Sequence, residues 1–197
     1  MRGQAITSLE RSPFVLNVHD LARRPGEMMR ENLELTVPEF WGTAVIGIRP
    51  QEELDVELRL ESVLEGVLVT GQAQSEARGE CVRCLDEVVY ELDANITALF
   101  AYPERAKAAE ESGDDDEDEV FVIDHDDIDL EPVIRDSLVT ALPFQPLCDR
   151  DCPGLCPECG IRLADHPDHK HDSVDIRWAG LQEAFGANQA SDDTKES

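Results

Sequence analysis

The chain has 197 residues, of which 44 are Asp or Glu and 17 are Lys or Arg, so its formal net charge is -27 at pH 7. A field of that sign repels a phosphate backbone, which argues against nucleic-acid binding over the whole surface and favours basic proteins as partners. The aromatic share of 5% also argues against a broad stacking surface for single-stranded nucleic acid. The apolar share of 41% is enough for one buried core, and the length suggests one domain with appendages.

The beginning of the chain, MRGQAITSLERSPFVLNV, lacks the apolar segment of a signal peptide. No stretch of the sequence reaches the roughly 18–20 apolar residues that a membrane helix requires. We therefore expect a cytoplasmic protein with no membrane partner. In a reducing compartment, closely spaced cysteines are typical of metal or redox sites rather than disulfides.

The first hundred residues show the period-two alternation of strands. A short apolar strand is expected at 14–18, and alternating residues follow at 31–38, 54–60, 67–71 and 88–100. Such a pattern predicts antiparallel strands with one face buried and one face wet. We predict the α+β class: an antiparallel β meander or partly closed barrel, with one packed helix and a Cys/His zinc-binding C-terminal segment.

The composition changes abruptly after residue 103, where the N-terminal β-rich part of a single domain is expected to end. GDDDEDE occupies 113–119, and no Lys or Arg occurs from 108 to 134. Self-repulsion and low apolar content predict a disordered acidic insertion at 104–127. This run could imitate a phosphate chain toward a basic partner, or be only a solvated loop.

Helical periodicity follows the insertion. Asp129 can cap a helix that has Pro132 in its first turn and ends at Pro143. The apolar stripe of this helix consists of Leu130, Val133, Ile134, Leu138, Ala141 and Leu142. A second helix is expected at 175–185, so residues 128–186 would hold a helix, the zinc-binding segment and a C-terminal helix, before a disordered tail at 187–197.

The six cysteines fall into three closely spaced pairs. They are Cys81 and Cys84, Cys148 and Cys152, and Cys156 and Cys159. A two-residue spacing lets both thiolates of a pair converge on one ion, and a following Gly160 permits the tight turn. A structural Zn²⁺ ion takes four such ligands in a tetrahedron.

His169 and His171 raise the number of candidate ligands to eight, so one or two zinc ions per chain are expected. The preferred partition combines Cys81, Cys84, Cys148 and Cys152 on one ion, and Cys156, Cys159, His169 and His171 on the other. A second partition places Cys148, Cys152, Cys156 and Cys159 on one ion and leaves Cys81 and Cys84 as a dithiol. A third joins Cys81, Cys84, Cys156 and Cys159 as a zinc ribbon.

The surroundings of the cysteines indicate a structural role for the metal. Arg83 and Arg150 stand beside ligands and can offset the negative charge of a four-thiolate site. Cys81 and Cys84 lie between two strand patterns, at a hairpin tip, whereas a thioredoxin-like redox pair opens a helix. The sequence shows no order of residues typical of nucleophilic catalysis and no Gly-rich phosphate loop. We therefore expect a protein without catalytic activity or a small-molecule substrate.

Several strings resemble the YceD family, the large-ribosomal-subunit RNA accumulation proteins. They are GECVRCLDEVVYEL at 79–92, DLEPVIRDSLVTALPFQPLC at 129–148, DCPGLCPECGIRL at 151–163 and DIRWAGLQ at 175–182. The resemblance implies a role in accumulation of large-subunit ribosomal RNA, and members are typically encoded beside a small basic ribosomal protein. Some members resemble this chain but carry a Cys pair near the place of His169 and His171. The acidic insertion departs from the family.

Resemblance and charge together suggest that the protein binds a basic ribosomal protein, an assembly factor or a large-subunit precursor, with any contact to ribosomal RNA being indirect. The alternative is a zinc-ribbon-type RNA-binding protein with a local basic patch. The candidate arginines for that patch are Arg23, Arg24, Arg30, Arg78 and Arg83. A third hypothesis is a metal or redox buffer.

Overall fold

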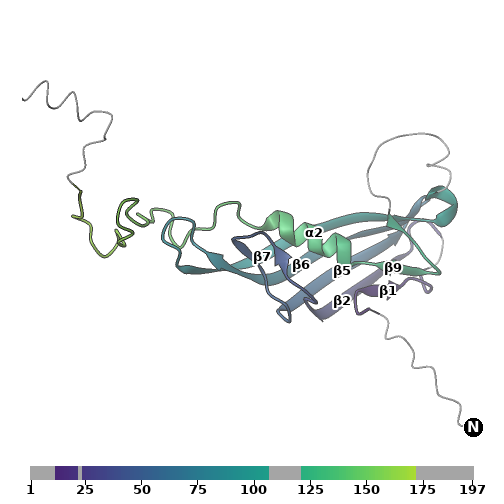
Figure 1. The fold of residues 1–197 in the computed structure, drawn as a ribbon. Coiled ribbons are helices and arrows are strands. Elements are labelled where there is room, and N and C mark those ends of the chain that lie inside the picture. Colours follow the sequence, from purple (N-terminus) through teal and green to yellow (C-terminus); the bar gives the residue numbers. More distant parts are fainter. Residues whose placement is uncertain (1–11, 22–23, 107–120, 172–197) are drawn as a thin grey trace, which may run out of the picture. The chain divides into compact units, whose positions relative to one another are not determined.

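The computed structural model describes residues 12–21, 24–106 and 121–171 (Figure 1). The chain divides into two compact units, Met1–Cys152 and Pro153–Ser197. The segment expected at 128–186 is therefore split between them, because its helix belongs to the first unit. The helix expected at 175–185 and the tail at 187–197 lie outside the described residues.

The first unit is built on a curved sheet whose central strand is β6 (Gly66–Glu80). One edge of β6 pairs first with β5 (Glu53–Ser62) and then with β4 (Ile46–Ile48), and its other edge pairs with β7 (Glu87–Ala101). The sheet is completed by β2 (Met28–Thr36) beside β5, β3 (Trp41–Gly42) beside β4, and β8 (Phe121–Val122) beside β7. The β7–β8 pair is parallel and the others are antiparallel.

Alternating side chains explain why these segments form strands with one buried face. In β5 the buried apolar residues are Leu54, Val56, Leu58 and Leu60, and the residues between them are charged and exposed. In β7 the same alternation runs from Leu92 to Phe100. The predicted arrangement of mostly antiparallel strands in a partly closed sheet is confirmed at this level.

One helix, α2 (Glu131–Ala141), packs on β7, β6 and β3. Its buried residues are Val133, Ile134 and Leu138, which belong to the stripe expected from the sequence. The N-cap residue is Leu130, but the carboxylate of Asp129 accepts the N–H of Glu131 at 3.0 Å, as a capping group would.

Strand β1 (Val15–Asn17) pairs with β9 (Asp127–Asp129) in a separate two-stranded sheet. Phe14, directly before β1, is buried against Trp41, with ring centroids 5.8 Å apart. Strands β8 and β9 fall partly within the segment 104–127, for which disorder was expected. Residues 104–106 are helical, and residues 121–127 hold β8 and the first residue of β9, so the expected boundaries are too wide. Residues 107–120 lie outside the described part of the chain.

Candidate metal centres

The four cysteines of the first unit form one group, named here the sulfur cluster: Cys81, Cys84, Cys148 and Cys152. Their sulfur atoms all lie within 4.8 Å of one another. The Sγ atoms of Cys84 and Cys148 are 3.5 Å apart, and those of Cys81 and Cys152 are 3.9 Å apart. Sulfur ligands at about 2.3 Å from a tetrahedral Zn²⁺ are about 3.8 Å from one another. The cluster therefore has the dimensions of a four-thiolate zinc site.

The first cysteine pair is presented by the turn between β6 and β7. The N–H of Cys81 donates to the carbonyl of Asp86 at 2.7 Å, and the N–H of Leu85 donates to the carbonyl of Cys81 at 2.9 Å. Leu85 closes this turn in the left-handed region, with φ of 64°. The turn points both thiols to one side, as the expected hairpin tip would.

The second pair is brought to this turn by the segment that follows α2. The N–H of Val82 donates to the carbonyl of Pro146 at 2.9 Å. The hydroxyl of Tyr90, in β7, donates to the carbonyl of Leu147 and accepts its N–H, each at 2.9 Å. These contacts fix the main chain directly before Cys148, so the position of the cluster does not depend on its sulfur atoms alone.

The environment of the sulfur cluster gives its thiols unequal acidities. Burial by itself raises the pKa of Cys81, but N–H groups of Cys148, Arg83 and Cys84 point at its sulfur and lower the pKa to about 6. The pKa of Cys84 is raised to about 12; burial is the largest cause, and the neighbouring thiols of Cys148, Cys81 and Cys152 raise it further. Cys81 is therefore the more acidic of these two thiols, and a cation held between them would stabilise the deprotonated form of both.

Arg83 lies beside this cluster, as the sequence suggested. Its guanidinium donates to the carbonyl of Cys152 at 2.9 Å and to that of Arg150 at 3.5 Å. Arg150 itself is exposed and contributes its carbonyl to this contact. Arg83 thus joins the two cysteine-bearing turns and places a positive charge near the thiolates.

The second unit holds another group, named here the Cys–His cluster: Cys156, Cys159, His169 and His171. Its four ligand atoms also lie within 4.8 Å of one another. The Sγ atom of Cys159 is 3.2 Å from each Nε2 atom of His169 and His171, and the two Nε2 atoms are 2.7 Å apart. A tetrahedral Zn²⁺ would separate such atoms by about 3.3–3.6 Å. The donor set and its convergence fit zinc, and the two Nε2 atoms would move apart by about 0.6 Å to hold it.

The turn that carries Cys156 and Cys159 repeats the geometry of the first turn. The N–H of Gly160 donates to the carbonyl of Cys156 at 2.8 Å, and Gly160 has φ of 72°. The N–H groups of Cys159 and Glu158 are the main cause that lowers the pKa of Cys156 to about 6, against the opposing effect of burial.

Glu158, between the two cysteines of this turn, contributes a contact that the sequence analysis missed. Its carboxylate lies 3.3 Å from Nδ1 of His171, whose Nε2 faces the cluster. A carboxylate on the far nitrogen of a metal-binding imidazole fixes the ring and its tautomer. Glu158 and Tyr90 are thus supporting residues that ligand spacing alone did not indicate.

The two groups that the structure brings together are those of the preferred partition, each within one unit. The structure also places some of the arginines considered for an RNA-binding patch. Arg78 pairs with Glu76, and Arg83 is engaged with the carbonyl of Cys152. Arg24 and Arg30 are exposed, and Arg23 lies outside the described residues.

No helix within the described residues is long and apolar enough to cross a membrane. No solved structure matches the chain. An uncharacterized protein of Mycobacterium tuberculosis, Rv2926c, is 44% identical over 175 residues, which cover 89% of this chain and 83% of the relative. An uncharacterized protein of Mycobacterium leprae, ML1660, is 40% identical over 172 residues, covering 86% of this chain and 76% of the relative.

The family model described as "Large ribosomal RNA subunit accumulation protein YceD" matches residues 69–183. This range begins within β6 and includes the six cysteines and both histidines of the two clusters. The resemblance seen in the cysteine strings is therefore confirmed, and the chain belongs to the YceD family.

Proposed function

We propose that this protein is a non-catalytic, cytoplasmic ribosome-assembly factor that supports accumulation of large-subunit ribosomal RNA by binding a basic ribosomal protein or a basic assembly factor. Membership of the YceD family carries the ribosomal part of this proposal. The net charge of -27 favours a basic protein as the partner, because it disfavours direct contact with phosphates.

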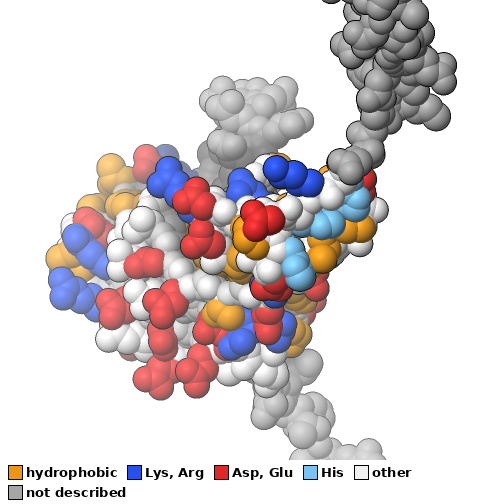
Figure 2. Space-filling model, turned by 90° about the vertical axis from the view of Figure 1, so that its left-hand side faces the viewer, with side chains coloured by type: hydrophobic (Ala, Val, Ile, Leu, Met, Phe, Trp, Pro, Cys, Tyr) orange, Lys and Arg blue, Asp and Glu red, His pale blue; other side chains and the backbone are white. Residues whose placement is uncertain are grey.

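The solvent face of β5, β6 and β7 supports this choice. A hollow of about 480 Å³ on this face is lined by acidic and polar side chains. Its carboxylates belong to Glu52, Glu53, Asp55, Glu76, Glu91 and Asp93. An extended segment rich in Lys and Arg would find opposite charges along it. Figure 2 shows acidic side chains spread over one side of the molecule, with basic ones among them.

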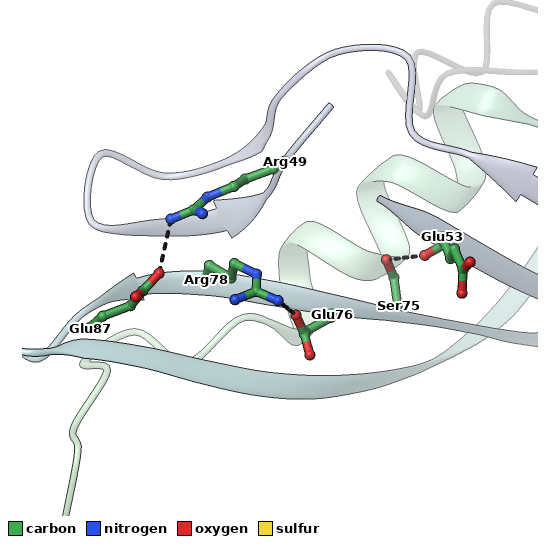
Figure 3. A network of polar contacts seen from close by, with 6 residues as sticks. All are labelled: Arg49, Glu53, Ser75, Glu76, Arg78 and Glu87. Carbon is green, nitrogen blue, oxygen red and sulfur yellow. Dashed lines mark hydrogen bonds and ion pairs between the residues drawn. The ribbon is translucent and has the colours of Figure 1, made fainter. Parts of the chain in front are cut away.

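Two of the basic side chains near this face are paired with acidic neighbours. Arg49, in the turn after β4, lies 3.2 Å from the carboxylate of Glu87, and Arg78 pairs with Glu76 on its own strand (Figure 3). These pairs reduce the positive potential available to a phosphate. They favour the protein-binding proposal over the RNA-binding alternative.

Zinc has a structural role in this proposal. An ion on the sulfur cluster would link the β6–β7 turn to the chain after α2, and an ion on the Cys–His cluster would order the second unit. Binding of structural Zn²⁺ supplies folding free energy of about 10–16 kcal/mol in small zinc peptides. Four thiolates, or two thiolates and two imidazoles, leave no open coordination position of the kind that a catalytic zinc requires.

The test is affinity purification of the tagged protein from its own cells, with and without nuclease treatment. We expect a basic large-subunit protein or precursor to remain bound after nuclease. Complete loss of association after nuclease would instead support RNA binding.

Charge-reversal variants test whether binding depends on the acidic face itself or only on the net charge of the protein. The triple variant Glu53→Lys, Asp55→Lys and Glu91→Lys should lose most of the captured basic protein. The matched control, Glu65→Lys, Glu104→Lys and Asp136→Lys, changes the net charge by the same amount at exposed positions away from the hollow, and should retain it. Equal loss in both variants would contradict a role for this face.

A further inference from the structure

Strand β2 leaves one of its edges open. It pairs with β5 in an unbroken register from Met28 opposite Glu61 to Thr36 opposite Glu53, and within the described ranges no strand pairs with its other edge. Proteins usually protect such an edge with charged side chains, especially Lys, with Pro, with a bulge or by keeping the strand very short. The nine residues of β2, MMRENLELT, contain no Pro, no Lys and no bulge, and their charged residues are Arg30, Glu31 and Glu34.

The neighbouring hydrogen bonds show which main-chain groups face outward. The carbonyl of Glu27 accepts the N–H of Ser62 at 2.9 Å, and the N–H of Val37 donates to the carbonyl of Glu52 at 3.0 Å, so odd-numbered residues bond toward β5. Because bonding alternates along an antiparallel strand, the N–H and C=O groups of the even-numbered residues point to the open edge. These residues, all exposed, are Met28, Arg30, Asn32, Glu34 and Thr36.

We propose that this open edge pairs with β2 of a second copy of the chain, antiparallel, about a two-fold axis at Asn32. In this register all nine residues overlap, and Arg30 of each copy lies opposite Glu34 of the other. On the inner face Met29 lies opposite Leu35. Opposite charges that face each other across antiparallel strands stabilise the pairing, and a two-fold axis provides that contact twice.

Neighbouring registers lack this complementarity. An axis at Glu31 would place the two Glu31 carboxylates opposite each other, and like charges in that position are destabilising. An axis at Leu33 would put Arg30 opposite Thr36 and leave Glu34 opposite Asn32. The charge pattern of β2 therefore selects the axis at Asn32. At this edge Arg30 and Glu34 balance each other locally, although the whole chain is strongly acidic.

The experiment is sedimentation velocity on the full chain over a range of concentrations at physiological ionic strength. We expect a monomer–dimer equilibrium for the natural sequence. R30E places a carboxylate opposite Glu34, and E34R places a guanidinium opposite Arg30, so each variant alone should dimerise at least tenfold more weakly. A one-to-one mixture of the two restores opposite charges at both pairs and should form a heterodimer with an affinity near that of the natural homodimer.

The control is R135E, which makes the same charge change on α2 and should leave the dissociation constant within twofold. Circular dichroism establishes that each variant is folded. A natural chain that stays monomeric at all concentrations overturns the proposal. So does a mixture of folded R30E and E34R that fails to associate, or an equal loss of dimer in R135E.

Discussion

The hydroxyl of Tyr90 holds both main-chain groups of Leu147, donating to its carbonyl and accepting its N–H, each at 2.9 Å. Tyr90 lies in β7, and Leu147 directly precedes Cys148 in the segment after α2. The sheet therefore positions the second cysteine pair through hydrogen bonds that exist without a metal ion. The sulfur cluster is therefore a preorganised site, and metal binding does not have to order a flexible loop.

Replacement of Tyr90 by Phe tests this preorganisation. The variant leaves two partly buried main-chain groups without their partner, which should lower the free energy of unfolding by about 1–3 kcal/mol. Urea denaturation of the metal-loaded protein measures the loss. Tyr102→Phe is the control, because Tyr102 follows the opposite end of β7 and its hydroxyl lies 3.3 Å from Ser62. A faster release of metal in Tyr90→Phe but not in Tyr102→Phe is also expected.

Single ligand substitutions test whether the two clusters bind independently. Cys84→Ser should remove one of two zinc ions and destabilise the first unit, because the β6–β7 turn loses its link to Cys148. Cys159→Ser should remove the other ion and leave unfolding of the first unit unchanged. Metal content by mass spectrometry and denaturation followed by Trp41 fluorescence, with Trp178 replaced by Phe in all variants, measure both effects. Two ions lost in either variant would contradict two separate sites.

Leu85 and Gly160 occupy equivalent places, each directly after a Cys-x-x-Cys pair and each with positive φ, 64° and 72°. The left-handed conformation costs a residue other than glycine about 1–2 kcal/mol. Leu85→Gly should relieve that cost, partly offset by about 0.5–1 kcal/mol of backbone entropy, and change stability by no more than about 1 kcal/mol in the favourable direction. Leu85 is 59% exposed, so little packing is lost.

The opposite change, Gly160→Ala, introduces that conformational cost into the Cys–His cluster. Nothing lies within 4 Å of the added Cβ, so strain and not collision would cause the effect. We expect zinc affinity at this cluster to fall by up to about tenfold, measured by competition with a chromogenic chelator. Unchanged affinity would show that the turn does not need the left-handed conformation.

Sequence could predict those parts of the structure that depend on local patterns of apolar and polar residues. Alternation in β5 and β7 and the stripe of α2 predict burial directly, and the strand patterns on either side of Cys81 and Cys84 predicted the turn there. The two-residue strand β3 and the three-residue strand β4 are too short for a periodic signal. Their pairing instead needs close backbone approach, since a Cβ at Gly42 would lie 2.4 Å from the Cα atom of Gly47.

The position of Arg83 beside the sulfur cluster was expected from the sequence, but two other supporting contacts of the candidate sites were not. Tyr90 looks like any strand residue in the alternation, and only the tertiary fold places its hydroxyl on Leu147. Glu158 lies between two cysteines in the sequence, but its contact with His171 depends on the orientation of the His171 ring. These two supporting residues were therefore found from geometry, whereas the candidate ligands were found from spacing.

The contact between His19 and Asp126 predicts a pH dependence. A hydrogen bond from Nδ1 to the Asp126 carboxylate at 3.1 Å, with the charges of Asp126 and Asp20, raises the pKa of His19 above its ordinary value of 6.5. Because the folded-state pKa is raised, this pair stabilises the fold fully below the unfolded pKa. The contribution is lost as pH rises through the folded pKa.

Asp126→Asn should return the pKa of His19 toward 6.5, measured by proton NMR titration of its imidazole signal. Asparagine tolerates the left-handed conformation of residue 126, where φ is 65°, so the turn that accepts the N–H of Val18 should persist. Asp20→Asn is the control and should lower the pKa less, because Asp20 acts on His19 by charge alone and is the weakest of the causes that raise it. An equal decrease in both variants would mean that net charge, and not the hydrogen bond, sets the pKa of His19.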